Sequence, residues 1–209
     1  MSASKPAYAV MGGTFNPIHM GHLVAAEAAR EAFSLDAVIF VPAGHPPHKE
    51  AAGVAAAEHR YLMTVLATAT HHAFQVDRME IDRPGPSFTS DTLRQLGERH
   101  AGARWYFITG ADAVLAMPSW HDARGIIRQA EVIAASRPGY RAPTVELKAW
   151  LGADEDRVHA LAVPALAISS SDIRVRVADG LSIRYLVPSA VADYIAKYHL
   201  YRRDDAPAP

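Results

Sequence analysis

The segment from Gly12 to His22, GGTFNPIHMGH, constrains the fold more than any other part of this chain. An apolar run from Tyr8 to Met11 precedes it, as expected of a buried parallel strand, and Leu23 to Phe33 follows with the periodicity of an amphipathic helix. The segment is therefore predicted to form a strand-to-helix turn, with the helix beginning near Gly21. Units of this kind build parallel sheets covered by helices.

Strand-like and helix-like stretches alternate along the rest of the chain. We expect further strands at 36–41, 74–78, 104–109, 131–135 and 158–163, and further helices at 58–71, 89–100, 170–178 and 189–198. Because parallel strands need helical crossovers, this order predicts an α/β fold, a Rossmann-like parallel sheet with helices on both faces. Ligands of such sheets bind beyond the carboxyl ends of the strands, where the strand order reverses. The loops after the first, second, fourth and sixth strands are therefore the places to expect a site.

The length and charge of the chain exclude several classes of protein. Its 209 residues fit one domain, expected over 1–203, with 204–209 as a frayed tail. A net charge of −1 gives no electrostatic footprint for a nucleic-acid polymer or an anionic membrane. No apolar run approaches about 18 residues, so neither a membrane span nor a secretion signal is expected. The absence of cysteine excludes disulfides and fits a cytoplasmic protein.

The residues of the glycine turn suit an anion. Gly12 and Gly13 lack the Cβ atoms that keep a ligand away from the backbone. The helix that begins near Gly21 offers unpaired N–H groups and the positive end of its dipole. His19 and His22 can donate hydrogen bonds to phosphate oxygens, and a nearby phosphate raises the pKa of an imidazole and favours its charged form. The turn is therefore predicted to hold a triphosphate.

Other sites fit this turn less well. A zinc site is not expected, because HMGH lacks the Glu of HExxH, the chain has no cysteine and no third ligand is obvious. A Rossmann dehydrogenase would show GxGxxG and an acidic residue closing the second strand, whereas that strand ends Val41, Pro42, Ala43. The GK[ST] of a P-loop is also missing. With 11 histidines in the chain, a chance pair three apart stays an alternative for HMGH taken alone.

Motifs spread along the whole chain carry a resemblance to one family. HxGH resembles the motif of the nucleotidyltransferase superfamily, which includes class I aminoacyl-tRNA synthetases and small-molecule adenylyltransferases. Six more segments follow in order: PPHK at 46–49, SFTSDTL at 87–93, GAD at 110–112, SWH at 119–121, SRPG at 136–139 and ISSSDIR at 168–174. With them, residues 7 to 202 resemble the bacterial nicotinate-nucleotide adenylyltransferases.

The resemblance implies an enzyme that couples nicotinate mononucleotide to ATP in NAD synthesis. It implies that Mg²⁺ arrives with ATP, without a dedicated protein site, and it leaves a homo-oligomer open. The expected catalytic residues are His19, His22, Arg174 and Lys49. The expected ATP-binding residues are Gly12, Gly13, Thr14, Phe15, His19, His22, Gly110, Asp112, Arg137, Ile168, Ser169, Ser170 and Arg174. The expected residues for the mononucleotide are Asn16, His48, Lys49, Thr89, Thr92, Trp120 and His121.

Most of these residues also have an ordinary structural explanation. Ser169 or Ser170 can simply cap a helix, and so can Asp112. Lys49, in the long loop at 43–57, can be a solvated surface lysine. Trp120 can be half-buried packing, although the resemblance makes it the plane on which the pyridine ring stacks. The helix start at 89–92 offers N–H groups to a carboxylate, or carries an ordinary cap.

Position 16 departs from the family pattern, in which many members have Asp. Asn16 keeps an acceptor and adds donors but removes a charge, so a metal-binding or basic role there is in doubt. Two other functions stay open: another small-molecule adenylyltransferase, such as one acting on pantetheine phosphate, and a non-catalytic nucleotide-binding protein. The first class usually lacks the SFTSDTL, SWH and ISSSDIR set. Intact His19, His22 and Arg174 argue against the second.

Overall fold

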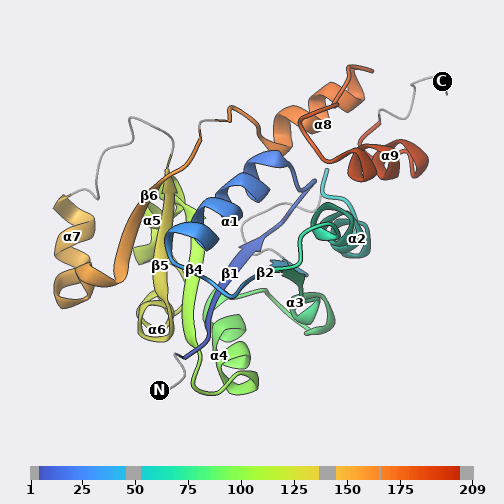
Figure 1. Cartoon of the computed structure of the whole chain (residues 1–209). Coiled ribbons are helices and arrows are strands. Elements are labelled where there is room, and N and C mark those ends of the chain that lie inside the picture. The colour runs from blue at the N-terminus through green and yellow to red at the C-terminus, as the bar shows by residue number, and fades with distance from the viewer. Residues whose placement is uncertain (1–4, 46–52, 137–144, 165, 203–209) are drawn as a thin grey trace.

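A six-stranded parallel sheet forms the centre of the molecule (Figure 1), with the strand order β3-β2-β1-β4-β5-β6. The computed structural model describes residues 5–45, 53–136, 145–164 and 166–202. The sheet runs through β1 (Ala7–Gly13), β2 (Ala37–Pro42), β3 (Phe74–Val76), β4 (Arg104–Gly110), β5 (Glu131–Ser136) and β6 (Val158–Ala162). β1 lies between β2 and β4, so the strand order reverses at β1 and β4. The α/β fold expected from the sequence is confirmed.

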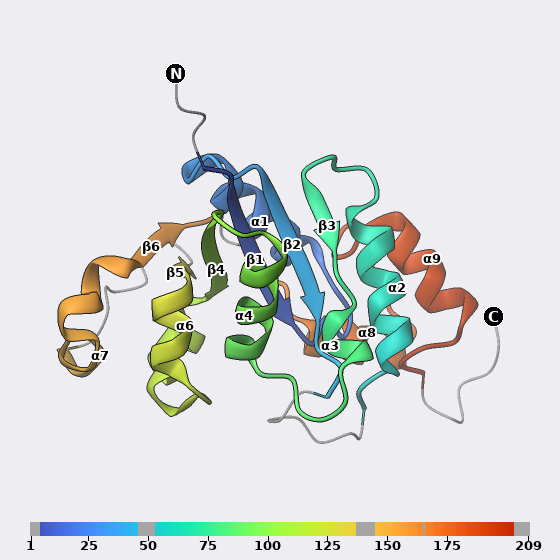
Figure 2. The ribbon, with the colours of Figure 1, turned by 90° about the horizontal axis from the view of Figure 1, so that it is seen from below.

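Helices cover both faces of this sheet (Figures 1 and 2). One face carries α1 (Met20–Ala32), α2 (Ala57–Thr68), α8 (Ser170–Ala178) and α9 (Ser189–Lys197). The other carries α3 (Met79–Asp82), α4 (Thr89–Arg99), α5 (Ala111–Ala116), α6 (Ala123–Gln129) and α7 (Val145–Leu151). Short 3₁₀ helices span Met117–Ser119 and Gly152–Arg157.

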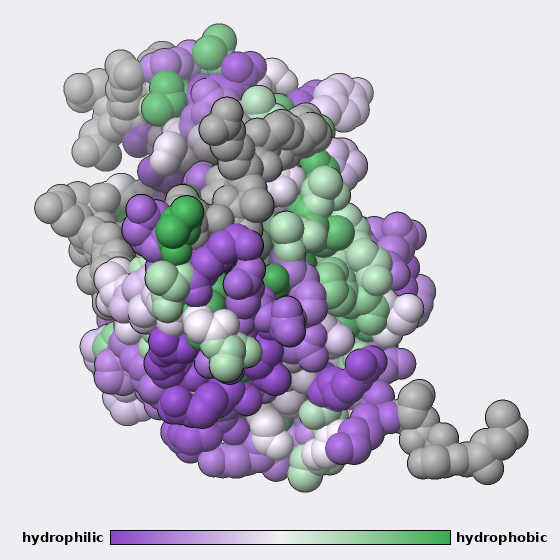
Figure 3. Space-filling model, turned by 90° about the vertical axis from the view of Figure 1, so that its left-hand side faces the viewer, coloured by the Kyte–Doolittle hydropathy of each residue, from purple (hydrophilic) through white to green (hydrophobic). Residues whose placement is uncertain are grey.

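The core is divided by the sheet into two apolar layers. Successive side chains of β1 point to opposite faces, so Ala9 and Met11 pack under α1 while Val10 packs under α4. Burial on both faces explains why the strands read as continuous apolar runs. The outer surface seen in Figure 3 mixes hydrophilic and hydrophobic residues. Among the described residues, the helices are too short or too polar to cross a membrane.

The structure changes several of the expected boundaries. The first helix begins at Met20, one residue before the expected start near Gly21, so this boundary agrees with the expectation. The second helix ends at Thr68, short of the expected residue 71. The helices α3, α6 and α7, of four to seven residues, were not expected, because isolated helices of that length are unstable and depend on packing.

Candidate active site

Two cavities open at the carboxyl ends of the central strands, where the strand order reverses. The first has a volume of about 320 Å³ and lies beyond β1, β4 and β5. Its wall includes Gly12, His19, Gly21, His22, Thr109, Gly110 and Ile168. The second has a volume of about 570 Å³ and lies beyond β1, β2 and β4. Its wall includes Gly12, Gly13, Thr14, Glu80, Ser87, Phe88, Thr89, Thr109, Trp120 and His121. Gly12 and Thr109 border both cavities, so the two spaces meet there.

The two histidines of the turn form one stacked unit. Their rings lie 3.7 Å apart between centroids, at an interplanar angle of 26°. The backbone N–H of His19 donates to Nδ1 of His22 over 3.2 Å, which leaves Nε2 of a neutral His22 to carry its ring proton. Burial lowers the pKa of His19 to about 4, so His19 is neutral at pH 7 in the protein alone. The charged form expected from the sequence therefore requires an anion close to the ring.

The glycines of the motif serve different purposes. Among the described residues, a Cβ atom on Gly12 would meet only the ring of Phe107, at an ordinary 3.8 Å, so that part of the protein does not require glycine there. A Cβ atom on Gly13 would come within 2.9 Å of the Phe15 ring. A Cβ atom on Gly21 would stand 3.0 Å from Nδ1 of His19. Gly21 therefore makes room for the catalytic candidate His19.

Phe15 and Asn16 lie inside the protein. The Phe15 side chain packs between Phe40 and His22 and is 3% exposed. Asn16 is buried too, and its side-chain amide donates to the Gly53 carbonyl over 3.0 Å. Its Oδ1 accepts from the Ala55 N–H and the Tyr201 hydroxyl. Both side chains stand behind the turn, which they hold in place.

The ISSSDIR segment approaches the glycine turn from the other side. Ser169 is the N-cap of α8 and accepts the N–H of Asp172 over 3.0 Å, so the capping alternative holds for this residue. Ser170 donates to the Pro17 carbonyl, and Arg174 donates to the Asn16 carbonyl over 2.9 Å. Arg174 thus contacts the turn directly. Its side chain lines a third hollow of about 490 Å³, together with Ser171 and residues 53–55.

The start of α4 and the SWH segment form much of the second cavity. Phe88, the N-cap residue of α4, makes no side-chain cap bond in the described structure, and Thr89 follows it on the cavity wall. The His121 ring stacks on Phe88, with 4.2 Å between centroids. Trp120 meets the edge of Phe107 at 6.1 Å. Thr92 is buried, and its hydroxyl bonds with Glu80.

The remaining expected residues are less informative. Gly110 lines the first cavity, while Asp112 is exposed in the first turn of α5. His48, Lys49 and Arg137 lie outside the described residues. Their roles stay predictions from the sequence.

Glu80 and Ser87 are among the residues of the second cavity that sequence reasoning missed. Glu80 belongs to the short helix α3, which carried no periodic signal, so its burial was not foreseeable. Ser87 lies within SFTSDTL, and only the later threonines of that motif were selected. The position of Ser87 could have identified it, because it is a polar residue just before a helix start with unpaired N–H groups.

Comparison with known sequences gives concordant results. The family model for cytidylyltransferase-like proteins matches residues 10–176. A protein of Leifsonia xyli subsp. xyli, named "Probable nicotinate-nucleotide adenylyltransferase", is 50% identical over 199 residues, covering 95% of this chain and 96% of the relative. A protein of Moorella thermoacetica with the same name is 50% identical over 196 residues, covering 92% and 90% of the two chains.

Solved structures show the same fold at much lower sequence identity. The Plasmodium falciparum nicotinic acid mononucleotide adenylyltransferase complexed with NaAD superposes with a TM-score of 0.77 at 19% identity. The match covers 94% of this chain and 97% of that protein. The same Plasmodium falciparum enzyme complexed with APC gives a TM-score of 0.74 at 18% identity, with the same coverage of both chains.

Proposed function

Because the chain belongs to the nicotinate-nucleotide adenylyltransferase family, within the cytidylyltransferase-like proteins, we propose that its two cavities hold the two substrates of one reaction. The enzyme transfers AMP from ATP to nicotinate mononucleotide, giving nicotinate adenine dinucleotide and pyrophosphate in NAD biosynthesis. ATP occupies the first cavity, beside the stacked histidines. Nicotinate mononucleotide occupies the second, beside Trp120.

The observation that carries this assignment is the meeting of the cavities at Gly12 and Thr109. Adenylyl transfer requires the phosphate of one substrate to touch the α-phosphorus of the other. Gly12 has no side chain at this junction, and apart from its chain neighbours only the Phe107 ring, of the residues that the structure describes, lies within 4 Å of the place where its Cβ would stand. Reacting phosphates can therefore approach the backbone here.

The chemistry follows from the charges of the two substrates. An oxygen of the mononucleotide phosphate forms a bond to the α-phosphorus, and the bond between that phosphorus and the bridging oxygen breaks, releasing pyrophosphate with the electron pair. The nucleophile is already an anion at neutral pH, so the reaction needs no general base. Catalysis then consists of positioning the phosphates and stabilising charge as it develops. His19 and His22 line the first cavity and supply the N–H donors for this purpose.

The second cavity suits a pyridine ring that carries a carboxylate. Trp120 offers an aromatic plane in its wall. The start of α4 offers backbone N–H groups that lack a side-chain cap in the described structure. A helix of eleven residues presents the positive end of its dipole to an anion at this point. We assign the pyridine ring to Trp120 and the carboxylate to the N–H groups around Thr89.

The other assignments rest on the sequence motifs. Arg174 contacts the carbonyl of Asn16 and is proposed to assist the ATP phosphates from the far side of the turn. Lys49, His48 and Arg137 are proposed to contact the substrates on the strength of their motifs. ATP is the Mg²⁺ complex, since Mg²⁺ keeps most of its waters and binds through substrate phosphates. We also propose a cytoplasmic location.

Pyrophosphate release from MgATP tests the proposal. With nicotinate mononucleotide present we expect release that is proportional to enzyme, and formation of the acid dinucleotide in equal amount. Pantetheine phosphate in place of the mononucleotide separates the related adenylyltransferases, and MgATP alone gives the background. Release only with pantetheine phosphate, or binding of both nucleotides without release, contradicts the proposal.

A further inference from the structure

Glu80 is a carboxyl group buried at the back of the second cavity. It belongs to α3, is 6% exposed and contributes to the cavity wall. A buried carboxylate is costly unless charged or hydrogen-bonding partners surround it. The groups that surround Glu80 therefore indicate which role compensates for the cost of burying this carboxylate.

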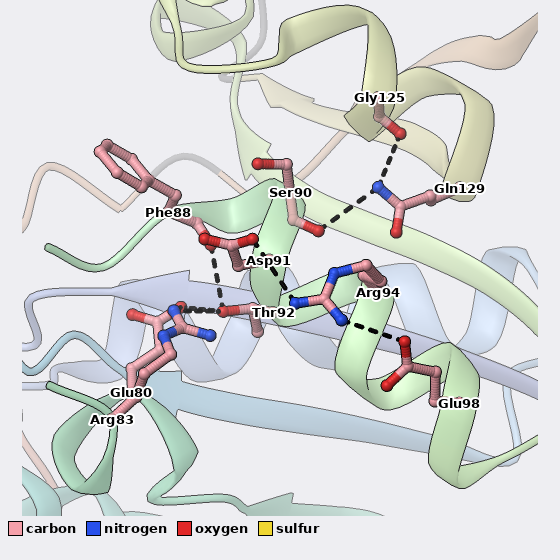
Figure 4. Close-up of polar contacts among 10 residues, drawn as sticks. All are labelled: Glu80, Arg83, Phe88, Ser90, Asp91, Thr92, Arg94, Glu98, Gly125 and Gln129. Atoms are coloured by element: carbon pink, nitrogen blue, oxygen red, sulfur yellow. Dashed lines mark hydrogen bonds and ion pairs between the residues drawn. The ribbon is translucent and has the colours of Figure 1, made fainter. Parts of the chain in front are cut away.

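The partners of Glu80 come from two different elements of the cavity wall. In Figure 4, Glu80 and Arg83 reach toward Thr92 in the first turn of α4. The Thr92 hydroxyl donates to Oε1 of Glu80 over 2.5 Å, and Nη2 of Arg83 donates to the same hydroxyl over 3.2 Å. That Nη2 also lies 4.0 Å from Oε1 of Glu80. Ser87, just before α4, lines the same cavity, and its side chain acts to lower the pKa of the Glu80 carboxyl group.

Both hydroxyl groups have a fixed polarity. Oγ of Ser87 accepts the backbone N–H groups of Gly44 and His45, at 3.0 and 3.2 Å, so its single proton is available for Glu80. Oγ1 of Thr92 accepts from Arg83, and its own proton has Oε1 of Glu80 as the nearer acceptor at 2.5 Å and the Phe88 carbonyl as a longer second acceptor at 3.3 Å. An ionised Glu80 carboxylate can accept from both hydroxyls, whereas an amide at this position can do so only in part. Burial raises the pKa of Glu80, while the hydrogen bond from Thr92 and the charge of Arg83 oppose that change.

The backbone of Glu80 also fixes the end of β2. A Cβ atom on Gly44 would lie 2.1 Å from the Glu80 carbonyl oxygen, so the two backbones are in direct contact. Through Ser87, the same residue is linked to Gly44 and His45, and through Thr92 to the turn that carries Phe88 and Thr89. Glu80 thus connects two walls of the cavity in which we place the mononucleotide.

We propose that Glu80 is a positioning residue for the pyridine mononucleotide, which fixes the start of α4 against the end of β2 so that the helix N–H groups face the substrate carboxylate. The inference rests on the proposed function, because it assumes that the mononucleotide occupies this cavity. It assigns no contact between Glu80 and the reacting phosphates. Its effect is on affinity and on the choice between acid and amide.

Steady-state kinetics of Glu80→Gln tests the proposal. Glutamine has nearly the same volume as glutamate, but its NH₂ group is a donor and would face one of the two hydroxyl protons, that of Ser87 or that of Thr92. The contact between position 80 and that hydroxyl is then lost. We expect the KM for nicotinate mononucleotide to rise about tenfold, equivalent to one lost hydrogen bond to a charged group, while the KM for MgATP stays within about twofold. The preference for the acid over the nicotinamide form should shrink by a similar factor, because the carboxylate site is the part disturbed.

Asp82→Asn is the matched control. Asp82 is on the same short helix, its side chain is 58% exposed and it bonds with Arg78 at the surface. This variant should leave both KM values and the acid preference unchanged. Thr92→Val removes the other half of the link and should reproduce the Glu80→Gln result, whereas Thr92→Ser keeps the hydroxyl and should restore parent values. The Thr92 pair carries the test if Glu80→Gln does not fold.

Two results would overturn the inference. One is a folded Glu80→Gln variant whose KM for the mononucleotide and acid preference match the parent. The other is an equal rise in both KM values, which indicates a general loss of structure. Failure of the proposed function is distinguishable, because it appears in the parent enzyme as absent pyrophosphate release with nicotinate mononucleotide.

Discussion

The two cavities share Gly12 and Thr109 but differ in where their titratable and aromatic side chains come from. Four residues of the first cavity, Gly12, His19, Gly21 and His22, come from eleven consecutive residues. The second draws its wall from the glycine turn, the end of β2, α3, the start of α4, the SWH segment and α6. The two histidines proposed to act on the phosphates thus come from one local turn, while the side chains proposed to recognise the second substrate come from elements that are distant in the sequence.

This contrast has a functional consequence. Changes in the first cavity should act mainly on the rate of transfer, because its donors are proposed to face the reacting phosphates. Changes in the second should act mainly on affinity and selectivity, because its groups are proposed to face the pyridine ring. The following predictions test that division, beginning with the largest expected effect.

Removing either histidine should cost the most. We expect His19→Ala and His22→Ala each to lower kcat on the order of 10²-fold or more, since each removes a donor to developing charge. Thermal melts recorded beside the kinetics establish that the variants fold. Near-normal kcat in both folded variants would place the chemistry elsewhere.

Selectivity should depend on the second cavity. We expect kcat/KM for nicotinate mononucleotide to exceed that for the nicotinamide form by about 10² or more, because the amide NH₂ would face backbone donors and leave groups unpaired. Trp120→Ala should reduce both values by about tenfold, since stacking does not distinguish acid from amide. Equal efficiencies in the parent would refute the carboxylate site. A loss confined to one substrate in Trp120→Ala would refute the separate role of stacking.

A smaller effect is expected at Gly21. In Gly21→Ala the new methyl group presses on the His19 ring, so we expect kcat to fall about tenfold, a barrier change of roughly 1.4 kcal/mol, with the KM for the mononucleotide unchanged. Gly97→Ala is the control, because nothing lies within 4 Å of the added Cβ atom in α4. If Gly21→Ala retained full kcat, the position of His19 would not depend on this glycine.

The smallest effect on catalysis is expected at Asn16. We expect Asn16→Asp to keep activity within about tenfold, because the family pattern accepts both residues and the side chain faces away from both cavities. The carboxylate would still accept from Ala55 and Tyr201 but would oppose the Gly53 carbonyl, so the melting temperature should fall. A several-hundredfold change in kcat would show that charge at position 16 takes part in the chemistry.

The sequence was most informative where structure is local. The strand, turn and helix around residues 7–32 were predicted closely, because the apolar run and the helical periodicity both lie within a single short window. The position of the cavity, where the strand order reverses, was also predicted from the general geometry of parallel sheets.

Other features depend on contacts between distant residues and carry no local signal. Burial of Glu80 requires α3, Ser87 and Thr92 to meet, and no window of sequence contains that arrangement. The neutral state of His19 likewise follows from burial within the assembled fold. The contact that a Cβ atom on Gly21 would make with the His19 ring is likewise visible only once the turn is folded.

A crystal structure of the enzyme with nicotinate mononucleotide and an ATP analogue whose α,β-bridging oxygen is a methylene group tests the central claim most directly. The account predicts the triphosphate beside His19 and His22, the pyridine ring against Trp120, and the mononucleotide phosphate next to the α-phosphorus at Gly12. A pyridine ring in the first cavity, or a triphosphate that does not contact the two histidines, would contradict it.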